Sequence, residues 1–356
     1  GGSFRHAAVG AAGARRLSAR AAIAHRPVKR LALERHQLWG YLAALALGGA
    51  LGLAAPGAGA ALEALLWPVL ALLLYATFCQ VPLTRVRGAL ADTRFLAALF
   101  TANFAAVPLL VWIMVSLLPP DPALRLGVCL VLLVPCTDWF NTFNYLGGGD
   151  AARGVAATPL LLLAQFVLLP AYLLLFLGES ALDVMAGERF LQAFAGLILL
   201  PLAAAWATER WALRHPSGKT ALESLAWAPV PLLALTLLLI AASQTGTLLE
   251  LPLEELSGAL ALFVAYVFLA AWTGRAVARR FRLDTAAART VVFSAGTRNS
   301  FVVLPLALAL PAGREIAVAV IVLQSVVELF GMLFYLRWVP RRLLPDAARP
   351  DGSQAS

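Results

Sequence analysis

The sequence predicts an all-α polytopic membrane protein, with ten transmembrane helices arranged as two inverted five-helix repeats. Three observations lead to this prediction. Of the 356 residues, 61% are hydrophobic and only 13% are charged, against about 25% charged in typical soluble domains. Apolar segments of about 20 residues, the length that crosses a bilayer core, recur along the chain. Two of these segments, one in each half, are interrupted by polar residues at matching positions.

Residues 36–178 and 188–339 are assigned to the two repeats, on either side of an acidic connection, and residues 340–356 to a cytosolic C-terminal tail. Residues 1–35, rich in alanine and arginine, are expected to form a disordered, basic cytosolic tail, with an organelle transit peptide as the alternative. The spans are predicted at 36–55, 62–81, 94–118, 123–146, 153–177, 189–207, 221–243, 255–277, 286–311 and 314–338.

Lysine and arginine near the ends of the spans predict the orientation, because these residues concentrate on the cytosolic side of a membrane. With the N-terminus in the cytosol, only Arg125, Arg189 and Arg314 of the 28 Lys and Arg fall in outer loops. We therefore expect a plasma-membrane protein with both termini in the cytosol. This asymmetry accounts for the net charge of +9, and no basic stripe with interleaved aromatic residues indicates a nucleic-acid partner.

The predicted fourth span is interrupted at Pro135, which lacks a backbone donor and disrupts the preceding helical turn. Cys136, Asp138, Asn141 and Asn144 follow it within an otherwise apolar run. A helix break at membrane depth persists only when it is buried in protein or lines an aqueous cavity. An ionisable side chain is costly there, so Asp138 indicates a functional site and requires a partner.

The two halves match at an offset of 160 residues, which relates Trp67 to Trp227 and Asp138 to Arg298. Because each half has an odd number of predicted helices, the second half enters the membrane from the opposite side. Interrupted helices at corresponding positions of two inverted halves indicate the solute site of a transporter. We expect Asp138 and Arg298 to approach each other. They form either a permanent ion pair or a switch that opens when a proton or a substrate binds.

Cys136 differs from Cys79 and Cys129 because it follows the helix break and precedes polar residues. Soft sulfur suits a thiol-seeking substrate such as trivalent arsenic or antimony, whereas a buried cysteine otherwise serves as a small apolar residue. The cysteines show no zinc-ligand spacing, so a transient metalloid contact at Cys136 is the only metal interaction expected. Polar side chains that either bind a hydroxylated solute or satisfy the interrupted backbone complete the candidate substrate site: Thr137, Asn141, Asn144, Arg298, Asn299 and Ser300.

Glu328 lies near the middle of the predicted tenth span, four residues after Gln324, so both side chains project from one helical face. Glu328 is either a protonated, hydrogen-bonded packing residue or a proton carrier. Arg298 thus has two possible carboxylate partners, Asp138 and Glu328. These four residues are the candidate coupling and gating groups.

Two motifs stand in the interrupted spans: Pro135-Cys136 leading through Asn141 and Asn144 to Tyr145-Leu146-Gly147-Gly148-Gly149-Asp150, and Gly296-Thr297-Arg298-Asn299-Ser300. With these motifs the chain resembles the bile acid:sodium symporter superfamily over about residues 36–340, and within it the arsenical-resistance permeases. This resemblance implies export of arsenite and antimonite, driven by proton entry. It also implies that Cys136 is the cysteine those permeases require, and that Asn144 is the asparagine of their motif.

Two departures from the family pattern bear on coupling. The arsenite permeases usually carry a glutamate in the second interrupted helix where this chain has Phe301, and Asp138 and Glu328 are the candidates for the missing acid. Sodium-coupled members carry a glutamate and a glutamine where this chain has Ser294 and Arg298. Since a guanidinium stays charged and has no acceptor atom, we expect no sodium coupling at that position.

The favoured function is a secondary transporter that exports arsenite or antimonite in exchange for protons by alternating access. The alternative is a sodium-independent transporter of organic anions, such as bile-acid-like carboxylates or sulfonates, in which Arg298 binds the anionic group. A third interpretation is a membrane sensor or scaffold that retains the fold. No nucleophile and base arrangement, phosphate loop or metal motif indicates an enzyme, and no cofactor is expected.

Overall fold

Helices form nearly all of the chain that the computed structural model describes. The described residues are 28–85, 92–137, 139–178, 187–250, 253–310 and 315–346. Within them the only β-structure is a single bridge between two loops. The helices are α2 (Val28–Ala54), α3 (Gly59–Phe78), α5 (Thr93–Thr101), α6 (Val107–Ser116), α7 (Pro122–Leu132), α8 (Trp139–Leu146), α9 (Ala151–Leu177), α11 (Glu188–Ala193), α12 (Leu200–Arg214), α13 (Pro216–Leu225), α14 (Pro229–Glu250), α15 (Leu253–Arg280), α16 (Thr285–Gly296), α17 (Ser300–Leu308) and α18 (Glu315–Trp338). Short π-helical or 3-10 turns join some of them: η1 (Pro56–Ala58), η2 (Leu83–Arg85), η3 (Ala102–Ala106), η4 (Phe194–Leu199) and η5 (Val339–Leu343).

Seven helical stretches among the described residues are long and apolar enough to cross a membrane. Of the other three predicted spans, the first corresponds to α2, whose apolar part covers Trp39–Ala54, and the fourth and ninth are each divided into two short helices. The chain is therefore an all-helical integral membrane protein, while ten spans in two inverted repeats remain a prediction. The seven stretches are Gly59–Phe78, Thr93–Ser116, Ala151–Leu177, Glu188–Arg214, Pro229–Gly246, Leu256–Arg280 and Glu315–Leu343.

The boundaries of the predicted tails and connection are tested only in part. Helix α2 begins at Val28, before the predicted first span at residue 36, so the end of the predicted tail is helical. Residues 1–27 and 347–356 lie outside the described residues, and so does the acidic connection at 179–186.

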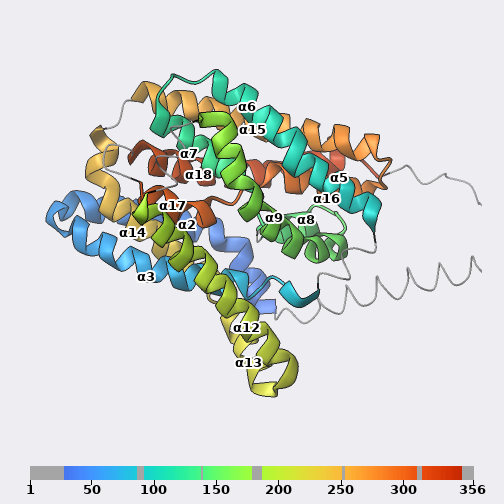
Figure 1. Ribbon diagram of the computed structural model, residues 1–356, viewed down its shortest axis with the longest axis horizontal. Coiled ribbons are helices and arrows are strands. Elements are labelled where there is room, and N and C mark those ends of the chain that lie inside the picture. The colour runs from blue at the N-terminus through green and yellow to red at the C-terminus, as the bar shows by residue number, and fades with distance from the viewer. Residues whose placement is uncertain are drawn as a thin grey trace, which may run out of the picture.

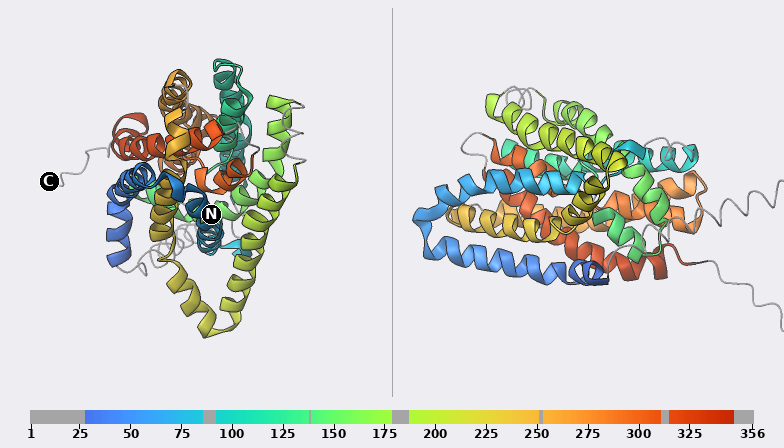
Figure 2. Two further views of the ribbon diagram at one scale, coloured as in Figure 1. Left: turned by 90° about the vertical axis from the view of Figure 1, so that its left-hand side faces the viewer. Right: turned by 90° about the horizontal axis from the view of Figure 1, so that it is seen from below.

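The helices pack as two groups. In the first group, α14 runs along α2 and α3, and α12 packs against α3 (Figures 1 and 2). In the second group, α15 packs along α16 and α18, and α18 packs along α7. Helix α17 contacts α3 as well as α18, so an interrupted helix lies where the two groups meet.

Two glycines allow α2 and α14 to pack closely. Gly48 and Gly52 lie about one turn apart on α2, and each faces the backbone of α14. A Cβ at Gly48 would lie 2.3 Å from the carbonyl oxygen of Leu238, and a Cβ at Gly52 would lie 2.6 Å from that of Ala242. Small residues at this spacing let helix backbones approach each other in a bilayer, where close packing drives helix association.

The predicted seventh span, 221–243, is divided in the structure. Helix α13 ends at Leu225 and α14 begins at Pro229, because proline suits the first turn of a helix but breaks a helix interior. Helices α12 and α13 form a hairpin that projects from the bundle (Figures 1 and 2). Gly218 permits this hairpin, since a Cβ there would lie 2.6 Å from the Cα of Ala212.

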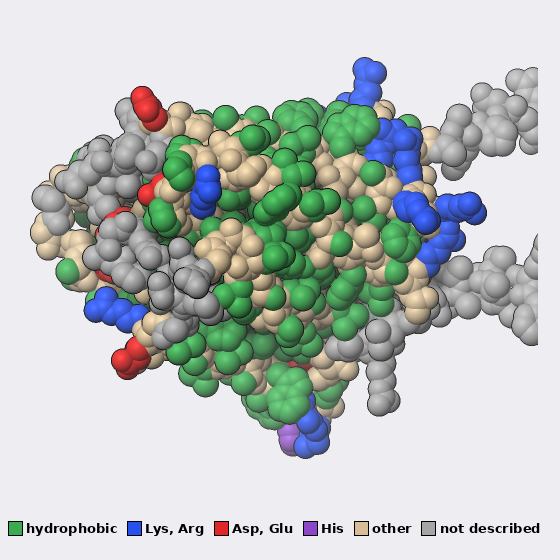
Figure 3. All heavy atoms as spheres, turned by 45° about the horizontal axis from the view of Figure 1, so that its top comes forward, with side chains coloured by type: hydrophobic (Ala, Val, Ile, Leu, Met, Phe, Trp, Pro, Cys, Tyr) green, Lys and Arg blue, Asp and Glu red, His purple; other side chains and the backbone are tan. Residues whose placement is uncertain are grey.

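The face of the molecule in Figure 3 has a broad apolar band between two ends that carry charged side chains. Figure 3 shows this band across the middle of the molecule, with visible Lys and Arg mainly at its right-hand end and visible acids mainly at its left. Val167 and Leu175 illustrate the band, because they are 74% and 75% exposed within an apolar helix. A surface of this kind matches the hydrocarbon core of a bilayer.

We expect Gly48→Ala to lower the midpoint of thermal unfolding, Tm, of the protein in detergent. The added methyl group collides with α14, and overpacking of this kind costs about 1–3 kcal/mol. The matched control is Gly49→Ala, because nothing lies within 4 Å of a Cβ at Gly49. Alanine there should leave Tm unchanged or raise it, since it is the better helix former. Equal Tm values for the two variants would show that α2 and α14 do not pack as described.

Candidate functional site

The two interrupted helices cross at their breaks, where main-chain hydrogen bonds join them. Pro135 and Arg298 form an antiparallel β-bridge. The N–H of Cys136 donates to the carbonyl of Thr297 (3.1 Å). On the other side of the bridge, the N–H of Asn299 donates to the carbonyl of Val134 (2.8 Å). At each break, backbone N–H and C=O groups lose their hydrogen-bond partners within the helix. The bridge supplies new partners for them, which these groups need in the water-free interior of a membrane.

The bridge fixes which residues of the two breaks face each other. Arg298 lies opposite Pro135, three positions before Asp138, which the repeat alignment matched to it. In an antiparallel crossing, residues that match between two repeats need not lie opposite each other, so the bridge does not test the offset of 160 residues. Asp138 lies outside the described residues, so its approach to Arg298 stays a prediction.

The guanidinium of Arg298 points into a group of oxygen atoms, and the residue is only 2% exposed. Nη2 donates to Oδ1 of Asn103 (2.8 Å) and to the carbonyl oxygens of Ser294 (2.7 Å) and Ala295 (2.8 Å). Nη1 donates to the carbonyl of Leu132 (3.3 Å). The side chain therefore connects α16 with the end of α7 and with the η3 turn.

Two residues absent from the sequence-based site complete the surroundings of this guanidinium. Asn103, in the π-helical turn η3, also donates through Nδ2 to Oγ of Ser294 (2.9 Å). Tyr266 of α15 places its ring 5.9 Å from the Cζ atom of Arg298 and donates its hydroxyl to the carbonyl of Ala295 (2.8 Å). A lone amide in the apolar third span was a usable signal for Asn103, whereas nothing in the sequence distinguished Tyr266.

Glu328 contacts Arg298 through the main chain and not through the guanidinium. Oε2 of Glu328 accepts from the N–H of Arg298 (2.7 Å) and from Nε2 of Gln324 (2.7 Å). Oε1 of Gln324 in turn accepts from Oγ of Ser300 (2.6 Å). Glu328 therefore meets Arg298 at its main chain, whereas Asn103 and backbone carbonyls accept from Nη1 and Nη2 of the guanidinium. Whether the charge of Arg298 is paired with Glu328 or with Asp138 stays a prediction.

Cys136 lies at the crossing, and polar side chains of the same two breaks have atoms without a partner among the described residues. Cys136 is 5% exposed. Oγ1 of Thr137, the next residue in the chain, is one such buried atom, and Nδ2 of Asn299 is another. Asn299 uses its Oδ1 to cap α17, accepting from the N–H of Val302 (3.3 Å). Because buried polar groups are normally hydrogen-bonded, these atoms mark a place where a hydroxylated solute has partners to meet.

An aromatic contact joins the first group of helices to the crossing. Trp139, the first residue of α8, stacks on Tyr41 of α2 with ring centroids 5.9 Å apart. Trp139 also packs edge-on against Phe301 of α17, at 5.6 Å. At the position where the resemblance led us to expect a glutamate, the structure therefore has a packed ring.

Asn141 and Asn144 lie on α8, as predicted, but their amides bind the next helix. Nδ2 of Asn141 donates to Oγ1 of Thr158 on α9 (3.0 Å), and Nδ2 of Asn144 donates to the carbonyl of Asp150 (3.3 Å). Gly149 leaves space for Asn144, since a Cβ there would lie 1.8 Å from Oδ1 of that residue. These two amides hold the turn between α8 and α9, and their Oδ1 atoms have no partner among the described residues.

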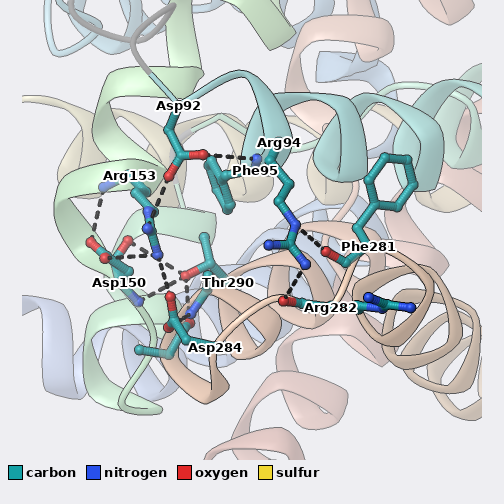
Figure 4. Close-up of polar contacts among 11 residues, drawn as sticks. Asp92, Arg94, Phe95, Asp150, Arg153, Phe281, Arg282, Asp284 and Thr290 are labelled. Atoms are coloured by element: carbon teal, nitrogen blue, oxygen red, sulfur yellow. Dashed lines mark hydrogen bonds and ion pairs between the residues drawn. The ribbon is translucent and has the colours of Figure 1, made fainter.

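A charged cluster ties together the N-termini of three helices (Figure 4). Asp92, Asp150 and Asp284 are the N-caps of α5, α9 and α16. Arg153 lies among them, 2.9 Å from Asp92, 2.7 Å from Asp284 and 3.6 Å from Asp150. The carboxylates satisfy free N–H groups and the positive helix ends, while the guanidinium links them. Each aspartate stands just before a predicted span, a start signal that the sequence interpretation did not use.

Asp284 stays ionised more readily than an ordinary aspartate. Burial raises the pKa of its carboxyl, but the hydrogen bond from the N–H of Ala287 and the ion pair with Arg153 outweigh burial and hold the pKa below its usual value. The side chain of Asp284 is 60% exposed, so solvent screening limits the contribution of this pair to less than about 1 kcal/mol.

Comparison with known proteins gives one positive finding. A family model described as "Sodium Bile acid symporter family" matches residues 67–251, just over half of the chain. The matched region contains the first interrupted helix, including Cys136. A search of curated proteins finds no match to the sequence.

We expect Asp284→Asn to lower Tm at neutral pH and this difference to disappear in acid. Asparagine keeps the N-cap hydrogen bond but removes the charge. Because the pKa of Asp284 is lower in the folded state, the carboxylate stabilises the fold above its unfolded pKa. That contribution is lost as the pH falls through the folded value, below about 4. Thermal unfolding of both proteins across this pH range measures the effect.

The control for this prediction is a double-mutant cycle with Arg153→Gln. If the ion pair causes the difference, Asp284→Asn should have little effect at neutral pH once Arg153 is replaced. A difference in Tm that persists unchanged in acid would contradict the assignment.

Proposed function

The chain belongs to the sodium bile acid symporter family, whose members are membrane transporters, and from this premise we propose that it exports arsenite and antimonite in exchange for protons. The solute binds at the crossing of the interrupted helices. Transport follows alternating access, in which the two groups of helices expose the crossing first to one side of the membrane and then to the other.

The place of Cys136 at the crossing is the observation that carries this proposal. Its N–H closes the bridge to Thr297, and the next residue, Thr137, has a buried Oγ1 without a partner among the described residues. Nδ2 of Asn299, on the opposite strand of the same bridge, also lacks a partner among them. Trivalent arsenic and antimony favour soft sulfur ligands, and the hydroxyl groups of their oxyacids suit hydroxyl and amide partners.

Glu328 is the described acid best placed to carry the proton. Its carboxylate is 3% exposed, and Oε1 has no hydrogen-bond partner among the described residues. Oε2 accepts from Arg298 on the bridge and from Gln324, which binds Ser300 at the start of α17. A proton on this carboxylate weakens both charge-assisted bonds, and so links protonation to the geometry of the crossing. Asp138 is the second candidate.

Sodium is not the coupling ion in this proposal. The two positions at which sodium-coupled relatives have acidic and amide ligands are occupied by Ser294 and Arg298. Oγ of Ser294 accepts from Asn103, and the guanidinium of Arg298 occupies the space beside it. We assign the basic end of the molecule to the cytosol and the protein to the plasma membrane, in line with the distribution of Lys and Arg in Figure 3.

An organic-anion transporter is the second candidate, favoured by the family description, which names bile acid as the solute. In this alternative Arg298 binds a carboxylate or sulfonate. Nη1 and Nη2 already donate to four oxygens, and the residue is buried, so these two nitrogens must leave their contacts before they can bind an anion in bidentate fashion. Only Nε has no partner among the described residues. For this reason we rank the anion below the metalloid.

We expect everted membrane vesicles that contain the protein to accumulate arsenite when a proton gradient is imposed. Cys136→Ser should reduce the initial rate at least about tenfold, the effect of losing about 1.4 kcal/mol of binding. The matched control is Cys129→Ser. Cys129 is a buried residue of α7. A serine in its place can satisfy its hydroxyl group by donating to the carbonyl four residues earlier in the helix. This control should transport at close to the native rate.

Two outcomes contradict the metalloid function. Uptake of a bile acid, but not of arsenite, by both cysteine variants and the native protein would select the organic-anion transporter. Absence of movement of either solute would favour a sensor or scaffold.

We expect Glu328→Gln to abolish gradient-driven accumulation of arsenite while retaining exchange of labelled for unlabelled arsenite. Glutamine preserves the hydrogen bonds from Arg298 and Gln324 but cannot take up a proton. The two vesicle assays, run on one preparation, separate coupling from binding. Accumulation at the native level by Glu328→Gln would exclude this residue as the carrier and leave Asp138.

A further inference from the structure

We propose that the guanidinium of Arg298 is a tethered cation that permanently fills a monovalent-cation site built from the ends of two helices. Arg298 is then a positioning residue that holds the crossing together, and the solute binds beside it. This inference concerns the architecture of the crossing and is independent of which solute the protein carries.

The contacts of Nη2 resemble the surroundings of a bound ion. A terminal guanidinium nitrogen carries two hydrogens, yet Nη2 lies 2.7–2.8 Å from three oxygens, those of Asn103, Ser294 and Ala295. The carbonyl of Leu132 approaches the neighbouring Nη1 at 3.3 Å. Four oxygens, which we call the oxygen cage, therefore surround the positive charge. The cage offers one more acceptor to Nη2 than that nitrogen has hydrogens.

The oxygen cage attracts cations whatever fills it. Leu132 is the last residue of α7, while Ser294 and Ala295 lie in the last turn of α16. Carbonyls at the end of a helix have no partner within the helix and carry the negative end of its dipole. The two breaks thus bring two negative helix ends together at one point. A positive charge between them offsets this, and Arg298 supplies it.

The composition of the cage selects a monovalent cation. Its four ligands are three backbone carbonyls and one side-chain amide oxygen, all of them neutral. Carbonyl oxygens of this kind replace the hydration shell of alkali ions, whereas calcium and magnesium sites rely on carboxylates. Glu328 contributes to the surroundings by accepting from the backbone N–H of Arg298, outside the cage.

The cage is closed and its ligands are held in place. Tyr266 covers the guanidinium, and Arg298 is 2% exposed. Asn103 uses Nδ2 to donate to the carbonyl of Leu99 and to Oγ of Ser294, which turns its Oδ1 toward the guanidinium. In the native protein a free alkali ion therefore has no place at the crossing. Removal of the guanidinium leaves the same four oxygens around an unfilled site.

The test is the cation dependence of Tm for Arg298→Gln, purified in full length in detergent. Tm is measured in sodium chloride, potassium chloride and choline chloride at equal ionic strength. We expect a lower Tm than native in choline, because choline is too large for the cage. Sodium or potassium should restore it in a saturable manner, by about 2 to 4 °C for each tenfold increase above Kd.

Three variants make the result specific. The native protein and Arg298→Lys keep a tethered charge, so the choice of cation should not change their Tm. Arg298→Gln combined with Asn103→Ala lacks one cage ligand and should lose most of the response to alkali ions. Arg275→Gln removes an arginine that stacks on Trp272, away from the crossing, and should show no such response.

The proposal is overturned if Arg298→Gln has the same Tm in choline as in both alkali salts. It is also overturned if this variant yields no folded protein in either alkali salt, since a filled cage should support the crossing. Both outcomes are read from purified protein without any transported solute. They can therefore be distinguished from a failure of arsenite export.

Discussion

Main-chain hydrogen bonding at the crossing is the constraint on which the rest of the structure depends. A membrane interior supplies no water to pair with released N–H and C=O groups, so a helix can break there only where another segment satisfies it. Here the two breaks satisfy each other, because Pro135 and Arg298 form a bridge flanked by a hydrogen bond on each side. Pro135 lacks an N–H of its own, so it fits a position in the bridge that requires no donor. The interrupted helices are therefore one unit, and neither break has a complete set of partners alone.

The polar side chains at the crossing divide into two sets with different consequences. Asn103 and the helix ends accept from Nη1 and Nη2 of Arg298, and only Nε of this guanidinium has no partner among the described residues. Thr137, Asn299 and Glu328 each have one buried polar atom without such a partner, and in our proposal these atoms meet the solute or the proton. The hydrogen bonds of a charged side chain therefore help to predict whether it supports the fold or meets a solute, and those of Arg298 favour the first role.

Two sets of contacts outside the bridge hold the interrupted helices in position: the charged cluster around Arg153 and the aromatic contacts of Trp139. At the charged cluster, Arg153 draws together the N-caps of α5, α9 and α16, which fixes where α16 starts before it reaches the break. On the other side of the crossing, Trp139 packs between Tyr41 and Phe301 and connects the first group of helices to α8 and α17. Both contacts lie between segments far apart in sequence. They allow the short halves of the interrupted helices to keep their direction although each has little internal stability of its own.

The sequence by itself determined that the chain is an integral membrane protein and where its two helices break. Apolar composition follows from the bilayer, and Pro135 acts through the local geometry of its own backbone, so neither depends on distant contacts. Only the tertiary structure decided which groups the polar side chains at the two breaks bind. It showed that the guanidinium of Arg298 binds carbonyls and Asn103, that Glu328 meets the main chain, and that Asn144 supports a turn. Periodicity and repeat offsets give the order of residues along a helix. Which residues of the two breaks lie opposite each other depends on how the breaks cross, and only the folded backbone fixes that register.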